Sequence, residues 1–112
     1  MLEKSEVRPL PLIKADVSIV PLNPGDSMSE EIAVCHRILH DAGLSPMLHA
    51  HGTNVEGDWE TITSAVRQCH DALHQDGFAR IQSTILIESR NDKIQSSTDK
   101  IRSVVQKMLA TQ

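Results

Sequence analysis

The sequence predicts one α+β domain with a ferredoxin-like βαββαβ sandwich, in which two helices cover one face of a four-stranded antiparallel sheet and an extra C-terminal helix follows. The motif Cys-His-x-x-Leu-His-x-x-Gly occurs twice, from Cys35 to Gly43 and from Cys69 to Gly77. Each copy ends a segment with helical periodicity, and segments with strand periodicity flank both copies. A period of 34 residues also occurs in all-helical tetratricopeptide arrays, but Val- and Ile-rich strands have no place there. The motif therefore marks equivalent helices in two βαβ halves.

The chain begins with a segment that lacks any regular apolar period. Residues 1–13 contain two prolines, so we expect a flexible lead-in there and a domain that spans residues 14–112. Apolar and polar residues then alternate from Ala15 until Pro21 stops the pattern. This segment is predicted to form the first strand.

The first helix is predicted between two capping signals. Ser27 and Glu30 have the spacing of a capping box, and Gly43 supplies a left-handed C-terminal cap. Between them, apolar residues recur at spacings of three and four, as they do on one face of a helix. These residues are Met28, Ile32, Cys35, Leu39 and Ala42.

A hairpin and a second helix are predicted next. Residues 44–57 contain two short extended runs joined near Gly52, and a hairpin is the simplest connection between them. Asp58 is placed to cap a helix that ends at Gly77. The predicted apolar stripe of this helix consists of Trp59, Ile62, Val66, Cys69 and Leu73.

The last two elements are predicted to be a long strand and a third helix. Residues 80–88 alternate along their whole length, with isoleucines at most positions of one face. After a polar loop, apolar residues return at helical spacing in the C-terminal segment. These residues are Ile101, Val104, Val105, Met108 and Leu109.

Alternation assigns the strand residues to two faces, because both main helices lie on one side of the sheet. The covered face is predicted to hold Ala15, Val17, Ile19, Ile81, Ile85 and Ile87. The uncovered face is predicted to hold Asp16, Ser18, Val20, Met47, His49, Asn54, Glu56, Gln82, Thr84 and Leu86. The second set is too apolar for a solvated face and too polar for a core, which is typical of a subunit interface or a small-molecule platform. We expect the sheet of a second copy to cover its apolar members.

Composition and charge exclude several classes of function. The net charge is −4 with scattered Lys and Arg, so the basic patch of a nucleic-acid-binding protein is missing. No run of 18 apolar residues is present, so no association with a membrane through a span is expected. The start lacks the apolar segment of a secretion signal, and the chain has two Cys. We therefore expect a cytoplasmic protein with free thiols.

The histidines of the repeated motif allow an alternative function. His36 with His40, and His70 with His74, have the spacing of a Zn chelate, so they predict a metal-binding or metal-sensing protein if the two flanks face each other. Otherwise they are solvated or packed histidines near helix ends, and the protein holds no metal. The two interpretations stay open at this point.

Catalytic residues are not evident. No nucleophile, base and orienting residue form a recognisable set, so we expect a binding protein rather than an enzyme, without a cofactor. An enzyme acting on a small cation or a pyrimidine is a weaker alternative. Asp16 and Glu56 are either solvated or, on a half-buried face, able to accept hydrogen bonds from an aminopyrimidine.

Three stretches resemble the single-domain thiamine-binding-protein-like family. They are HGTNVEGDW (51–59), GFARIQSTILIESRNDK (77–93) and DKIRSVV (99–105). The resemblance runs from about Ala15 to Leu109. It implies a ferredoxin-like domain, a tetramer built as a pair of dimers, and non-catalytic binding of thiamine or its hydroxymethylpyrimidine part.

The resemblance also implies ligand-binding residues. The positions that match its motif are Gly52, Thr53, Glu56, Gly57, Arg90 and Asp92. The uncovered sheet face adds Ser18, His49 and Thr84 as residues that a ligand can touch. The predicted ligand site lies on the sheet face or at a subunit interface, in a dimer or a tetramer.

Overall fold

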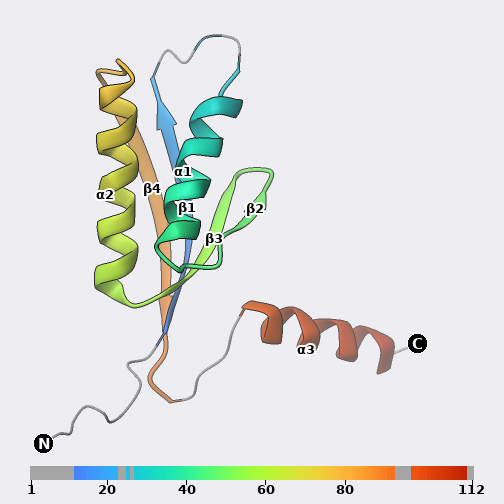
Figure 1. Cartoon of the computed structure of the whole chain (residues 1–112). Helices are drawn as coiled ribbons and strands as arrows, with labels where there is room; N and C mark the ends of the chain where they lie inside the picture. Colours follow the sequence, from blue (N-terminus) through green and yellow to red (C-terminus); the bar gives the residue numbers. More distant parts are fainter. Residues whose placement is uncertain (1–11, 23–24, 26, 93–96, 111–112) are drawn as a thin grey trace, which may run out of the picture.

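The computed structural model describes residues 12–22, 25, 27–92 and 97–110. Most of the expected lead-in, residues 1–11, lies outside them, and the first strand already begins at Ile13. The elements, shown in Figure 1, are β1 (Ile13–Pro21), α1 (Ser29–Asp41), β2 (Met47–His49), β3 (Gly52–Gly57), α2 (Trp59–Gln75), β4 (Ile81–Ser89) and α3 (Ser97–Ala110).

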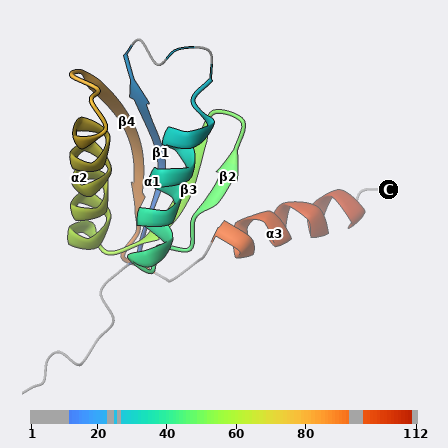
Figure 2. The ribbon, with the colours of Figure 1, turned by 45° about the horizontal axis from the view of Figure 1, so that its top comes forward.

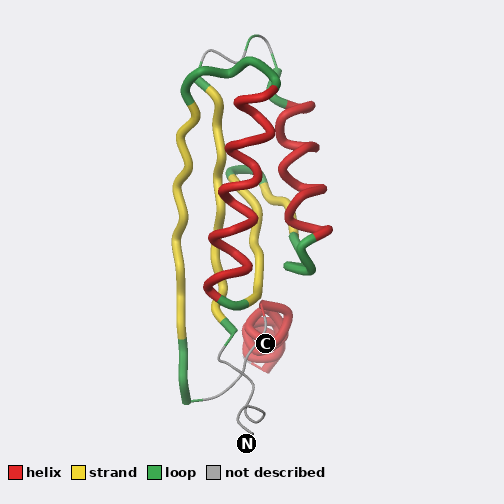
Figure 3. Tube along the Cα trace, turned by 60° about the vertical axis from the view of Figure 1, so that its left-hand side comes forward, coloured by secondary structure: helices red, strands yellow, loops and turns green. Residues whose placement is uncertain are grey.

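The four strands form one antiparallel sheet in the order β2-β3-β1-β4. The two central strands belong to different halves of the chain, as the predicted ferredoxin-like sandwich requires. Helices α1 and α2 lie side by side over one face of this sheet, and Figure 3 shows the strands together with the two helices that cover them. The predicted fold class is confirmed.

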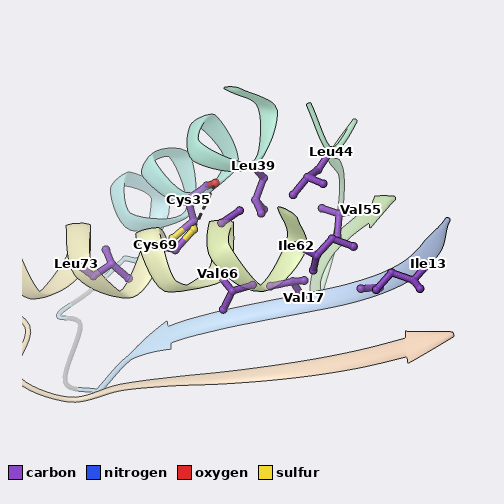
Figure 4. Close-up of a cluster of buried hydrophobic side chains, with 12 residues drawn as sticks. Ile13, Val17, Cys35, Leu39, Leu44, Val55, Ile62, Val66, Cys69 and Leu73 are labelled. Atoms are coloured by element: carbon purple, nitrogen blue, oxygen red, sulfur yellow. Dashed lines mark hydrogen bonds between the residues drawn. The ribbon is translucent and has the colours of Figure 1, made fainter. Parts of the chain in front are cut away.

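The register confirms the predicted division of strand residues between the two faces. Ala15 pairs with Val55 on β3 and with Ile87 on β4, so these three side chains share the covered face. Asp16 pairs with Asn54 and with Leu86 on the other face. The core between sheet and helices, drawn in Figure 4, consists of Ile13, Ala15, Val17, Cys35, Leu39, Leu44, Val55, Ile62, Ala65, Val66, Cys69 and Leu73.

Two details of the predicted helices are wrong. Helix α1 begins at Ser29 without a side-chain cap, because the Ser27 hydroxyl accepts from the backbone N–H of Ser29, only two residues ahead. Trp59 is 52% exposed, because the first turn of α2 lies beside an open groove with Arg90 instead of over the core. The predicted helix ends are confirmed, since Gly43 and Gly77 have φ angles of +80° and +102°.

Asp58 is the predicted cap of α2, and it makes the stability depend on pH. The backbone N–H and hydroxyl of Thr61 donate to its carboxylate at 2.8 and 3.0 Å, which lowers the pKa of Asp58. A lowered folded-state pKa stabilises the fold above the unfolded-state pKa of about 3.9, and this contribution is lost as the pH falls through the folded-state pKa.

Replacing Asp58 with Asn should therefore reduce the fall in melting temperature between about pH 5 and pH 2, because asparagine still caps the helix but does not titrate. Thr61→Val removes one of the two donors and should act in the same direction to a smaller extent. Thermal melts across this range check the expectation. An identical fall in wild type and Asp58→Asn contradicts it.

Helix α3 does not join the helical layer. It follows β4 and runs away from the sandwich, as Figures 1 and 2 show. Across the described part of the chain, no helix combines the length and the apolar character needed to cross a membrane.

Candidate ligand-binding site

A notch opens in the sheet because β1 is longer than the hairpin beside it. From Ile13 to Val17, β1 pairs with β3 on one side and with β4 on the other. From Ser18 to Pro21 it pairs with β4 alone. Helix α1 covers the unpaired part of β1 on one side, and the turn of the β2–β3 hairpin borders the space between them. The result is a cavity of about 270 Å³, here called the hairpin cavity.

The hairpin cavity has an apolar wall and a polar wall. Its apolar wall comes largely from α1, with Ile32, Cys35 and Leu39. Its polar wall comes from β1 and the hairpin. Four of the residues predicted to bind a ligand lie there, namely Ser18, His49, Gly52 and Thr53. Thr53 reaches the cavity from the covered face, where it is buried, whereas Ser18 and His49 belong to the uncovered face.

The polar wall is held by a hydrogen-bonded pair from different strands. Nε2 of His49 lies 2.7 Å from Oδ1 of Asp16, and the backbone N–H of His51 donates to Nδ1 of His49 at 3.2 Å. Because Nδ1 accepts a hydrogen bond, the ring carries its proton on Nε2 and donates it to Asp16. Both ring nitrogens are therefore engaged, and the imidazole is fixed in orientation.

Gly52 allows this pair to form. A Cβ atom at Gly52 would lie 2.7 Å from Oδ1 of Asp16 and 2.9 Å from the carbonyl oxygen of Val17. The second atom belongs to the backbone of the neighbouring strand and cannot move aside without separating β3 from β1. Any side chain at this position would displace Asp16 and narrow the cavity.

The edge of β1 supplies hydrogen-bonding groups without side chains. No described strand pairs with Ser18–Pro21 on the hairpin side. A strand edge presents backbone N–H and C=O groups in one plane at regular spacing. A flat heterocycle with donors and acceptors on its rim can pair with such an edge in the same way as a strand does.

A thiol pair lies behind the apolar wall. The Cys69 thiol donates to the Cys35 carbonyl oxygen at 3.8 Å, and Figure 4 shows the two sulfur atoms between α1 and α2. The two thiol side chains also interact with each other, which lowers the pKa of Cys35 and raises the pKa of Cys69. Only Cys35 lines the hairpin cavity. Both cysteines are free, as expected from the sequence.

Three further predicted residues lie outside the hairpin cavity. Thr84 stands opposite Ser18 on β4 and continues the polar row across the sheet. Glu56 stands opposite Lys14, four residues from Ser18 along β1 and so about 13 Å away. Gly57 has a packing role, because a Cβ atom there would lie 2.5 Å from Cδ2 of Leu44. A single small ring cannot contact both Ser18 and Glu56.

Arg90 and Asp92 also lie apart, in the loop that follows β4. Nε of Arg90 donates to Oδ1 of Asp92 at 2.6 Å and its terminal nitrogen donates to Oδ2 at 3.1 Å. This pairing raises the pKa of Arg90. The two residues line an open groove with Trp59 at the opposite end of β1 from the notch.

The two histidine pairs do not face each other, so the condition for the alternative four-histidine metal site is not met. His70 approaches the hydroxyl of Ser83 at 3.1 Å, and His74 approaches the carbonyl oxygen of Phe78 at 2.8 Å, which places this pair on the β4 side of α2. His36 and His40 line a groove on the opposite flank, beside β2. Among the described residues, no three potential ligands gather around a common point.

Comparison with known proteins gives consistent matches over most of the chain. Residues 15–105 match the sequence model of a family described as thiamine-binding protein. UPF0045 protein sll0230 of Synechocystis is 42% identical over 89 residues, which cover 80% of this chain and 74% of that protein.

Solved structures show the same fold. The hypothetical protein MJ1052 of Methanocaldococcus jannaschii superposes with a TM-score of 0.77 at 27% identity, over 85% of this chain and 97% of that one. Protein TM0486 of Thermotoga maritima, provisionally described as a thiamine biosynthesis or salvage protein, gives 0.71 at 19% identity, over 84% and 99%. At that identity the likeness concerns the fold alone.

Proposed function

The chain belongs to the thiamine-binding protein family, and from this membership we propose that it is a non-catalytic protein that binds thiamine, or its hydroxymethylpyrimidine part, in the hairpin cavity. The observation that carries the choice of site is the notch beside β1. There an open strand edge, Ser18 and the His49–Asp16 pair converge on one space.

The chemistry of an aminopyrimidine suits this notch. Its amino group donates and its ring nitrogens accept hydrogen bonds, all in the plane of the ring. The edge of β1 offers acceptors and donors in a plane, and the apolar wall from α1 can contact the face of the ring. A volume of about 270 Å³ lies slightly below the usual range for ligand pockets, which starts at about 300 Å³. The pyrimidine ring therefore suits the interior, and a thiazolium ring would extend through the mouth.

The engagement of His49 supports binding rather than catalysis. A general base needs a free ring nitrogen within reach of the substrate, and here one nitrogen accepts from His51 and the other donates to Asp16. We infer that the pair orients the polar wall and does not transfer protons.

The proposal includes self-association through the uncovered sheet face. Leu86 is 72% exposed and Met47 is 47% exposed in a single chain, and both stand among polar residues on that face. Such a mixed face is typical of a subunit interface. A dimer or a tetramer of this chain would remove these side chains from water.

Titration with ligands tests the binding function. We expect hydroxymethylpyrimidine and thiamine to raise the melting temperature and to give a measurable heat in calorimetry, because a ligand of the native state stabilises it. Thiamine phosphates and an unrelated heterocycle serve as comparisons. The absence of any response to all pyrimidine compounds at millimolar concentration contradicts the proposal.

Cys35 provides a check on the location of the site. Because Cys35 lines the cavity and Cys69 does not, alkylation should start at Cys35 and should slow several-fold when hydroxymethylpyrimidine is bound. Mass spectrometry after timed treatment with iodoacetamide measures both thiols, and Cys69 serves as the internal reference for unfolding. Equal rates with and without a ligand that binds in calorimetry would place the ligand elsewhere.

A further inference from the structure

Helix α3 carries an apolar stripe that the rest of the chain does not cover. Its large apolar side chains recur at spacings of three and four, and between 45% and 62% of each is exposed. They are Ile101, Val104, Val105, Met108 and Leu109. No described element packs along this helix, and Figures 1 and 2 show it running away from the sandwich.

A helix of this length does not persist in water by itself. Isolated helices shorter than about 12–15 residues are marginal, and the 14 residues of α3 fall within that limit. Helical stability in proteins comes mainly from packing of an amphipathic face. The stripe therefore requires a partner surface.

Only the first turn of α3 touches its own sheet. Nζ of Lys100 donates to Oε1 of Glu88 at 2.8 Å, and Ile101 lines a shallow groove with Leu86. This contact lies at the rim of the uncovered face. The stripe is thus continuous with the exposed apolar residues of that face, but the later turns extend past the sheet.

The uncovered sheet face is opposite to α3 in charge, and the helix is long enough to cross it. Helix α3 carries three cations and one acid, Lys100, Arg102, Lys107 and Asp99, for a net charge of +2. The uncovered face carries three acids and one cation, Asp16, Glu56, Glu88 and Lys14, for a net charge of −2. Lys100 and Glu88 pair within one chain, so a net charge of +1 on the helix and −1 on the face remain for a second copy. The helix spans about 21 Å, which exceeds the distance of about 14 Å between the outer strands of the sheet.

We propose that α3 of one copy packs its apolar stripe against the uncovered sheet face of a second copy, and that the exchange is reciprocal. Each chain carries both the helix and the complementary face, so a two-fold pair buries both at once. Leu86 and Met47 of one copy are then covered by Val104, Val105 and Met108 of the other. The association does not depend on the ligand proposed above.

Charge substitutions on the two sides of α3 test this contact. Val105→Lys places an ammonium in the stripe and should weaken self-association by about a hundredfold or more, as measured by sedimentation equilibrium. Ser103→Lys adds the same charge to the same helix outside the stripe and should leave the association unchanged. Slow alkylation of the fully buried Cys69 in both variants reports that the domain stays folded.

Cross-linking of the unmodified protein tests whether the contact joins two chains. A mixture of light and ¹⁵N-labelled chains is treated with an amine cross-linker, and links between Lys14 on the sheet face and Lys107 on α3 are identified by mass. We expect mixed-label links. Links of a single label only would mean that α3 folds over its own sheet, and this result overturns the proposal. A monomeric wild type, or an unchanged association of Val105→Lys, overturns it as well.

Discussion

Replacing Gly52 with alanine is expected to weaken ligand binding in the hairpin cavity at least tenfold. The added Cβ atom would meet Oδ1 of Asp16 at 2.7 Å and the carbonyl oxygen of Val17 at 2.9 Å, so the His49–Asp16 pair must break or β3 must shift. Either change alters the polar wall of the cavity. Overpacking of this kind also lowers the free energy of unfolding by about 1–3 kcal/mol. Calorimetry with hydroxymethylpyrimidine should show at least a tenfold loss of affinity.

Gly57→Ala gives a matched comparison at the other end of the same strand. The Cβ atom there meets the flexible side chain of Leu44, so the variant should lose stability but retain its affinity for the ligand. Sequence resemblance alone makes both glycines ligand residues. Equal loss of binding in the two variants would contradict the hairpin cavity as the site, and so would normal binding by Gly52→Ala.

Replacing Leu86 with lysine is expected to dissociate the protein into monomers. Leu86 is 72% exposed in the single chain, on the uncovered face beside Asp16. If a second copy covers it, an ammonium buried in the interface should cost about 3 kcal/mol, which corresponds to more than a hundredfold weaker association. Analytical ultracentrifugation and thermal melts at several protein concentrations measure this effect.

Gln68→Lys is the control for the added charge, because Gln68 is exposed on α2 far from the sheet face. It should leave both the mass and the melting temperature unchanged. An unchanged mass for Leu86→Lys, or a monomeric wild type at micromolar concentration, would show that the uncovered face is not an interface.

Several features of the fold follow from short-range patterns. The alternation in β1 and β4 predicts which side chains face the helices, and the register confirms it. The capping role of Asp58 and the helix ends at Gly43 and Gly77 are also local properties, since each depends on residues within one turn. The predicted N-terminal cap of α1 is wrong, because the Ser27 hydroxyl has a second backbone N–H within reach. Ser27 accepts a bond from Ser29, so the helix begins later than its capping-box spacing suggests.

The candidate site depends on contacts that no local pattern contains. His49 and Asp16 are 33 positions apart, and their pairing requires the antiparallel register of three strands. Alternation places Asp16 on the correct face and allows it to meet a ligand, but nothing local predicts its bond to His49, and Cys35 is predicted only as a core residue. The site that combines all four histidines is not formed for the same reason. Spacing within one helix brings His70 near His74, but the packing of α1 against α2 decides that the two pairs point to opposite flanks.

The sequence by itself determined the order of elements, the two faces of the sheet and the amphipathic character of α3, because periods of 2 and 3.6 residues are local consequences of backbone geometry. The tertiary structure alone decided where a cavity opens. The notch exists because β1 continues to Pro21 while its pairing with β3 ends at Val17, and such a mismatch in length becomes visible only when the strands are in register. It also decided that Ser18, His49, Gly52 and Thr53 share one space while Glu56, Arg90 and Asp92 do not, since register and helix packing set distances between residues far apart in the chain.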